Sequence, residues 1–186
     1  MSTMKRTTLL LALCLLPTLM AGCLRSNAVK LTYKTAEMPI TCPGTAVVYK
    51  FEDQRKMKDQ LGWHQDGKPV LANSDVGGWI GWAVFDELMA AGCETKYRTT
   101  IVPTDVAVVT GEVLEVALNQ TGKTTFRARV ALNIRVQKDG QDVYVEKFIS
   151  EVEDIAMPGY GSQSDILAAA LKGAIETALP VICENL

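Results

Sequence analysis

The sequence predicts an α+β fold, a two-layer sandwich in which a mainly antiparallel sheet carries two helices on one face. Apolar and polar residues alternate over residues 126–137, a pattern typical of a strand with one buried face. The dipeptide Asp139-Gly140 that follows is a strong signal for a two-residue hairpin turn. Two segments, 76–91 and 162–179, carry apolar residues at helical spacing. The order strand, helix, strands, helix then favours both helices on one face.

The first predicted strand runs from Thr45 to Phe51 and is rich in β-branched and aromatic residues. Its alternation places Val47, Tyr49 and Phe51 on one side, so we expect a central strand. Residues 53–74 then turn polar and irregular, and they predict a long loop. Loops of this length inside compact domains are usually functional or mobile.

The first helix is predicted from Val76 to Ala91, with Ser74 or Asp75 as its N-cap and Gly92 as a left-handed stop. Its glycines would let it approach the sheet closely. The apolar arc predicted to face the core contains Ile80, Gly81, Trp82, Val84, Phe85, Leu88 and Met89. The opposite side contains Trp79, Ala83, Asp86 and Glu87.

Further strands are expected at 96–102 and 106–118, and a switch of apolar phase near Val113 predicts a bulge to which Gly111 contributes. The strand over residues 126–136 continues through the hairpin turn into a partner strand. If Lys138 lies opposite Gln141, turn and apolar pattern agree on one register. That register pairs Val136 with Val143, Ile134 with Val145 and Val130 with Ile149.

The last helix begins with Ser162 and Asp165, which resemble a capping box. Its apolar stripe contains Leu167, Leu171, Ile175, Ala178, Leu179 and Ile182. Because Pro180 lacks an amide proton, we expect it to end or kink the helix near Ala178 to Leu179.

The N-terminus predicts export and lipidation. Lys5 and Arg6 precede an apolar run that ends at Ala21-Gly22-Cys23, the order of a secretory signal. The exit resembles the lipobox of bacterial lipoproteins, in which the cysteine is acylated and becomes the first residue of the mature chain. This resemblance implies a signal peptide over residues 1–22, lipidation at Cys23, and an envelope protein held by its lipid. By analogy with enteric sorting, a residue other than Asp after the cysteine favours the outer membrane, facing the periplasm.

Residues 23–43 are interpreted as a lipidated tether and residues 44–186 as one domain. The tether lacks periodicity and would reach at most about 65 Å, unless Val29 to Tyr33 docks as an edge strand, which the sequence leaves open. The whole chain has a net charge of −2; removing a signal with two basic residues and no acid gives −4. Since no basic stripe is present, nucleic acid is excluded as an expected partner, and the domain is not expected to be drawn to anionic lipid by its charge.

Cysteines at positions 42, 93 and 183 are expected at one end of the domain, because strand and helix directions bring all three there. Outside the cytoplasm such thiols meet oxidising conditions, and an odd number leaves one free or paired with another chain. We favour Cys42 with Cys183, since both lie in segments able to adjust to disulfide geometry. Three buried thiols are the alternative.

Candidate partner-binding residues fall into two groups. Trp79, predicted on the polar side of its helix, and Trp63, in the long loop before it, would form an exposed aromatic surface; alternatively both fold inward. Arg127, Arg129 and Arg135 share the polar face of the hairpin. They would be either solvated surface charges paired with acids or a site for an anion or peptide.

The sequence gives little support for catalysis or cofactor binding. The chain has one histidine, His64 in a polar loop, and its cysteines lack the close paired spacing of zinc ligands. Glu151 and Glu153 lie in a strand as ordinary surface charge. We therefore expect no enzyme, no metal and no cofactor, with a hydrolytic enzyme as the less favoured alternative.

Several features together resemble the YajG-type envelope lipoproteins. They are the lipobox, the strand followed by Asp53-Gln54-Arg55, the helix ending in residues 87–92, the long hairpin and the alanine-rich last helix. The resemblance implies a periplasm-facing, lipid-anchored domain. The pattern of this chain is more loosely similar to auxiliary lipoproteins of ABC-type transporters and to regulators of peptidoglycan synthases. We expect a non-catalytic binding or assembly module with an envelope protein, lipid or glycan as partner; an auxiliary lipoprotein of a lipid or ABC-type transport system is the alternative.

Overall fold

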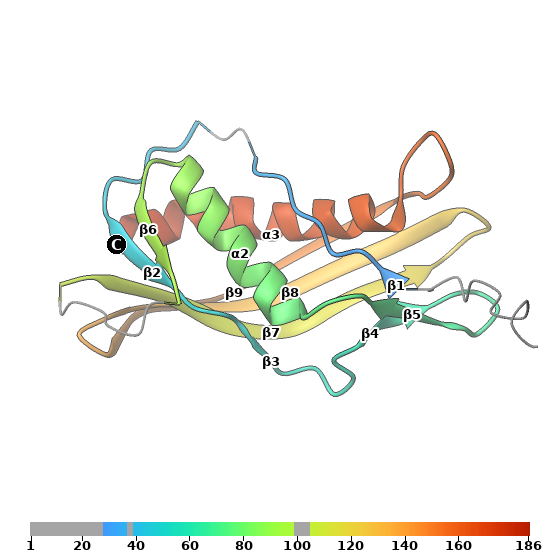
Figure 1. The fold of residues 1–186 in the computed structure, drawn as a ribbon, viewed down its shortest axis with the longest axis horizontal. Helices are drawn as coiled ribbons and strands as arrows, with labels where there is room; N and C mark the ends of the chain where they lie inside the picture. Colours follow the sequence, from blue (N-terminus) through green and yellow to red (C-terminus); the bar gives the residue numbers. More distant parts are fainter. Residues whose placement is uncertain (1–27, 37–38, 99–104) are drawn as a thin grey trace, which may run out of the picture.

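The computed structural model describes residues 28–36, 39–98 and 105–186. Its elements are β1 (Ala28–Val29), β2 (Thr45–Val48), β3 (Glu52–Asp53), β4 (Gln60–Trp63), β5 (Pro69–Ala72), α2 (Val76–Ala90), β6 (Glu94–Tyr97), β7 (Ala107–Gln120), β8 (Thr125–Lys138), β9 (Gln141–Ile155) and α3 (Gln163–Glu184). Within these ranges the strands form two sheets (Figure 1). The larger has the order β6-β2-β7-β8-β9 with β3 beside β7, and the smaller has the order β1-β5-β4.

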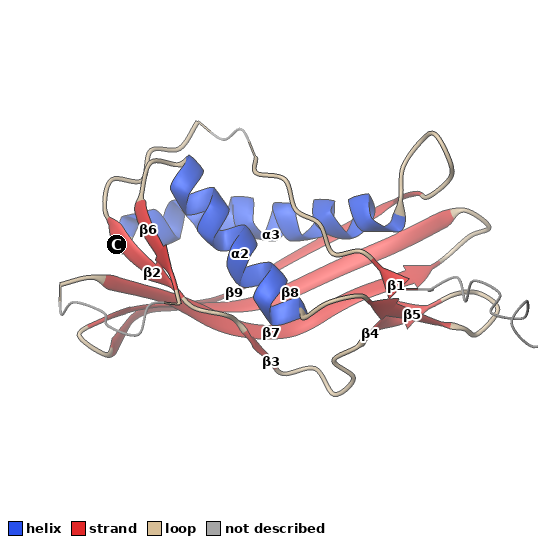
Figure 2. Ribbon diagram, in the orientation of Figure 1, coloured by secondary structure: helices blue, strands red, loops and turns tan. Residues whose placement is uncertain are grey.

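Both helices cover the same face of the larger sheet (Figure 2), so the two-layer α+β sandwich is confirmed. The long strands β7, β8 and β9 are antiparallel neighbours. Strand β2, in contrast, runs parallel to β6 and to β7. The sheet is therefore antiparallel in its long strands and parallel where the chain crosses over through α2.

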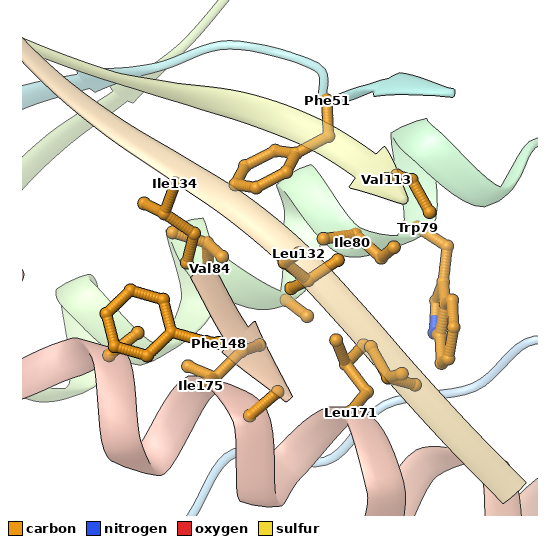
Figure 3. Packing of buried hydrophobic residues seen from close by; sticks show 14 of the residues in the cluster. Phe51, Trp79, Ile80, Val84, Val113, Leu132, Ile134, Phe148, Leu171 and Ile175 are labelled. Carbon is orange, nitrogen blue, oxygen red and sulfur yellow. The ribbon is translucent and has the colours of Figure 1, made fainter. Parts of the chain in front are cut away.

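The core lies between the sheet and the helices (Figure 3), where Phe51, Ile80, Leu132 and Ile175 are fully buried. Helix α3 contributes the whole stripe that the sequence predicted, from Leu167 to Ile182. By length and composition it is the one helix of the described ranges able to cross a membrane. Half of its most apolar window is buried against the protein, so it serves as a core helix.

The segment 53–74 is not the structureless loop that the sequence predicted. Strands β4 and β5 form an antiparallel hairpin, and β1 adds to β5 in parallel. The hairpin is stabilised by burial of Leu61 and Val70. Its strands have only four residues each, which is too short for a recognisable alternation.

The alternation expected in the first strand is also wrong. Strand β2 ends at Val48, and the chain bends before β3. Ala46 and Val48, rather than Val47 and Tyr49, belong to the core cluster, while Phe51 enters it from beyond the bend. Strand β6 corresponds to the start of the strand predicted at 96–102; residues 99–104 lie outside the described residues.

The predicted bulge in β7 is confirmed, because the pairing with β8 shifts between Val113 and Glu115. Gly111 was expected to contribute to this bulge, but it has a different role. A Cβ on Gly111 would lie 2.3 Å from the carbonyl oxygen of Asn133 and 2.6 Å from the ring of Phe51. The glycine therefore makes room for a core phenylalanine.

The hairpin of β8 and β9 forms at Asp139-Gly140, with Lys138 opposite Gln141 as predicted, but the register beyond the turn is wrong. A second irregularity shifts the pairing, so that Val136 lies opposite Tyr144 and Ile134 opposite Glu146. One extra residue at the bulge moves every following side chain of β9 to the other face. Phe148 consequently enters the core, and the valines and isoleucine expected there are about half exposed: Val143, Val145 and Ile149.

The helix ends follow local signals. Asp75 caps α2 by accepting a hydrogen bond from the amide of Gly78, and Gly92 stops the helix with a φ of 90°. Ser162 and Asp165 form the predicted capping box of α3. Pro180, however, does not end α3, which continues to Glu184. Burial of Ile182 and the disulfide at Cys183 hold the last turn in helical form, although Pro180 has no amide proton to donate.

A disulfide joins Cys42 to Cys183, with 5.1 Å between the Cα atoms. This is the pairing that the sequence favoured. Cys93 is free and buried, and its thiol donates a hydrogen bond to the carbonyl of Gly44. The bridge to Cys183, three residues before the C-terminus, and the contact of Cys93 with Gly44, two residues after Cys42, thus bring the three cysteines to one end of the domain.

Candidate partner-binding surfaces

The described N-terminal segment packs on the domain. Ala28 and Val29 pair with β5, and the chain then runs beside α2 and in front of α3 (Figure 1). The hydroxyl of Tyr33 and the amide of Ala36 both donate to the same carboxylate oxygen of Glu87, each at 2.6 Å. The docking that the sequence left open is therefore present, and it extends beyond strand pairing.

The contact between Tyr33 and Glu87 is a polar pair placed inside the protein. Glu87 is 1 % exposed, so its carboxylate depends on these two donors for the hydrogen bonds that water would otherwise supply. Desolvation of the phenol, and then its hydrogen bond to Glu87, raise the pKa of Tyr33 above its ordinary value. Tyr33 therefore remains a protonated donor at neutral pH.

The roles predicted for two tryptophans of α2 are reversed. Trp79, expected at the surface, is 9 % exposed, and its indole nitrogen donates to the carbonyl of Thr32. Trp82, expected in the core, is 50 % exposed. The N-terminal segment covers the Trp79 side of α2, which the sheet alone would have left open.

Trp82 belongs to a surface group that we call the aromatic patch, in which Phe85 and Tyr97 are partly buried and the others exposed: Trp82, Phe85, Met89, Tyr97 and Arg98. The rings of Trp82 and Tyr97 lie 4.0 Å apart between centroids with their planes 31° apart. Phe85 meets Trp82 edge-on at 5.4 Å, and the guanidinium of Arg98 lies 5.2 Å from the Tyr97 centroid. Met89, one helical turn beyond Phe85, is 54 % exposed.

Glycines of α2 explain why this patch forms where it does. A Cβ on Gly81 would lie 2.8 Å from the hydroxyl oxygen of Tyr97, so β6 brings its tyrosine over a bare stretch of helix. A Cβ on Gly77 would lie 2.1 Å from the carbonyl oxygen of Phe51. The close approach of helix and sheet that we expected from the glycines is thus confirmed.

The aromatic patch was not predicted from the sequence as a surface. An arc of seven apolar or small residues on α2 is wider than contact with one sheet requires. Part of this arc therefore had to remain outside the contact with the sheet. That width was the available signal. It does not reveal that the opposite side, with Trp79, becomes covered, because the covering segment lies more than 40 residues away in sequence.

Trp63 is 49 % exposed on β4, where it borders a shallow groove of about 430 Å³ together with Met57 and Leu114. Below the groove the guanidinium of Arg55 forms two hydrogen bonds with the carboxylate of Asp53, at 2.9 and 2.8 Å. Both side chains of this pair are more than nine-tenths buried. Trp63 and Trp79 are not brought together as one surface, because Trp79 is in the core.

The three candidate arginines are each paired with acids. Arg127 contacts Glu153 at 2.6 Å, Arg129 contacts Glu115 and Glu151 at 3.0 Å, and Arg135 contacts Glu112 at 2.7 Å. The hydrogen bonds that Arg127 and Arg129 donate to these carboxylates raise the pKa of both arginines. An anion at this face would have to displace carboxylates already in place, so the arrangement fits a paired sheet surface better than an anion site.

Groups suited to catalysis are not brought together in the described ranges. His64 lies 3.2 Å from the side-chain oxygen of Gln120 and edge-on to the ring of Phe126. Burial raises the pKa of the Cys93 thiol, which makes it a poor nucleophile at neutral pH. Within those ranges no three residues of the types His, Cys, Asp and Glu form a candidate metal site.

Comparison with solved structures shows relatives in fold. A protein from Xanthomonas campestris of the DUF330 family superposes with a TM-score of 0.57 at 11 % identity, over 86 % of this chain and 92 % of its own. An uncharacterized protein gives a TM-score of 0.51 at 13 % identity, over 82 % and 98 %. A putative lipoprotein from Caulobacter crescentus reaches only 0.44 at 15 % identity, over 61 % and 85 %.

At these identities the likeness concerns the fold alone. No protein-family model and no curated protein sequence matches the chain. The resemblance to YajG-type lipoproteins therefore stays an expectation drawn from the sequence.

Proposed function

We propose that this chain is a lipid-anchored lipoprotein of the bacterial envelope that binds a partner protein and catalyses no reaction. The aromatic patch is the observation that carries the binding role. Trp, Tyr, Phe, Met and Arg are the residue types enriched in the cores of protein interfaces. All five occur together in this patch, with Trp82 and Met89 each at least half exposed.

The patch is suited to a preformed contact. Its rings contact one another, Trp82 in a tilted stack with Tyr97 and edge-on to Phe85, so few side-chain rotamers remain to be fixed on binding. A compact group of rings with a polar edge favours a protein surface. Arg98 would supply hydrogen bonds at the rim of the contact.

The anchor is proposed at Cys23, and the residue after it, Leu24, favours the outer membrane with the domain facing the periplasm. Cys23→Ser is expected to move the protein from the membrane fraction to the soluble fraction or to leave an uncleaved precursor. Mass spectrometry of the membrane-bound wild type should show an acylated N-terminal cysteine. An unmodified mature chain that begins at another residue would contradict the anchor.

For the binding role, a photoreactive phenylalanine analogue at position 82 is expected to capture one reproducible envelope protein in living cells. The same probe at Gln141, exposed in the distant hairpin, is the matched control and should capture none. Trp82→Ala in a full-length chain should weaken recovery of that partner by chemical crosslinking while leaving the melting temperature nearly unchanged.

The same probe at Trp63 tests the surface that the sequence predicted. Capture at 63 but not at 82 would move the contact to the groove on β4. Equal capture at 82 and 141 would contradict a specific patch.

A further inference from the structure

We propose that the loop Met157–Gly161 lies in the headgroup region of the membrane and thereby holds the anchored domain in one orientation. The partner in this inference is the lipid surface itself. The inference rests on the proposed anchor at Cys23.

The first argument is the short distance between anchor and domain. Ala28, the first described residue, follows Cys23 by five positions, which span at most about 17 Å of extended chain. Ala28 and Val29 are fixed by pairing with β5, and the carbonyl of Lys30 accepts a hydrogen bond from Ser164 at 2.5 Å. The end of the domain that contains β1 must therefore stay close to the bilayer.

The second argument places the loop at this same end. A pocket of about 730 Å³ is lined by Ala28 and Val29 on one side and by Ser162 to Asp165 at the start of α3 on the other. The amide of Ala156, just before the loop, donates to the carbonyl of Thr124 in the turn between β7 and β8. In Figure 1 this loop and β1 lie at the end of the molecule opposite the C-terminus.

The third argument is the chemistry of the loop. Tyr160 is 69 % exposed, Met157 is 46 % exposed, and Ile155 just before them is 37 % exposed. Water-facing apolar side chains so close together need an explanation. A tyrosine places an apolar ring and a polar hydroxyl at the boundary between headgroups and acyl chains, where this residue type is enriched.

The loop also presents these side chains in a fixed way. Met157 and Gly161 form a β-bridge, and the amide of Tyr160 donates to the carbonyl of Met157. Gly159 provides the positive φ of 81° that the tight turn requires. Little conformational freedom would be lost on contact with lipid.

Charge at this end does not oppose the contact, although the mature chain is acidic. Lys30, Lys34 and Lys123 are exposed and form no ion pair among the described residues. Of the acids nearby, Asp66 pairs with Lys68 and Asp165 caps α3. Asp154, exposed next to Ile155, accepts a hydrogen bond from the amide of that residue, and the three lysines outnumber it. Apolar insertion supplies the affinity, and the lysines remove repulsion from anionic headgroups.

The test uses the full lipidated chain in vesicles of phosphatidylethanolamine and phosphatidylglycerol. An environment-sensitive fluorophore is attached through Tyr160→Cys, and in a matched variant through Asp139→Cys at the hairpin turn of the opposite end. We expect emission to shift to shorter wavelength and to be lost to a headgroup-located quencher at position 160, with neither change at 139.

Two results would overturn the inference. If position 160 shows neither change, or position 139 shows both as well, in protein shown to be vesicle-bound, the loop does not set the orientation of the domain, while the anchor stands. If mass spectrometry finds no acyl group on Cys23, both the anchor and this orientation fail. Lipidation is measured independently of fluorescence, so the two failures are distinguished.

Discussion

Replacing both Cys42 and Cys183 by serine is expected to lower the free energy of unfolding by about 3 to 5 kcal/mol. The bridge closes a loop with a sequence separation of 141, so it removes many conformations from the unfolded chain in the chain-entropy model. It also joins the approach to β2 to the last turn of α3, beyond Pro180. Urea denaturation of the oxidised wild type and the double variant measures the difference.

Cys93→Ser provides the matched control, because it makes the same exchange at a buried thiol that forms no bridge. We expect a much smaller loss of stability there. Reduction of the wild type should reproduce the result of the double variant. Equal stability with and without reductant would show that the pairing contributes nothing to the folded domain.

Arg55→Met is expected to cost about 3 to 5 kcal/mol, because it leaves a buried carboxylate without its partner. Asp53 and Arg55 are 7 % and 8 % exposed at their side chains. The guanidinium also donates to the carbonyls of Lys58, Gln60 and Val116, and so connects the β3–β4 segment to β7. Thermal and urea denaturation should both report the loss.

The double variant Asp53→Leu, Arg55→Met separates charge from packing. Removing both charges should cost less than removing Arg55 alone, since no unpaired ion stays buried. Lys68→Met, at the exposed pair of Lys68 with Asp66, is the control and should have little effect. A single variant as stable as wild type would show that Asp53 finds water or another donor.

Much of the fold was predictable because its signals are local. The alternation of β8, the turn at Asp139-Gly140, the cap at Asp75, the capping box of Ser162 and the stop at Gly92 each depend on residues a few positions apart. Strand and helix directions were enough to predict that the three cysteines meet at one end. The pairing of Cys42 with Cys183 is also confirmed, although Cys183 lies within α3 and not in the adjustable segment that we expected beyond Pro180. For Trp63 the sequence left exposure and inward folding open, and the side chain is exposed.

The wrong predictions concern contacts between distant segments. One extra residue in β9 near the turn reversed which side chains face the core, so Phe148 replaced Ile149 there. The alternation of β9 is visible in the sequence. The bulge that shifts its register depends on how the strand packs against α3. The small sheet was missed because β1 and β5 stabilise each other only after the chain has folded.

The sequence by itself determined the helices, the long strands, the paired cysteines and the N-terminal pattern that predicts an anchor at Cys23. Only the tertiary structure decided which side of α2 meets water. Tyr33 and Thr32 cover the flank that carries Glu87 and Trp79, whereas Trp82 is left exposed beside Tyr97. The physical reason is that burial of a helix face depends on the segments packed against it, and here a segment from elsewhere in the chain covers the flank opposite the predicted apolar arc.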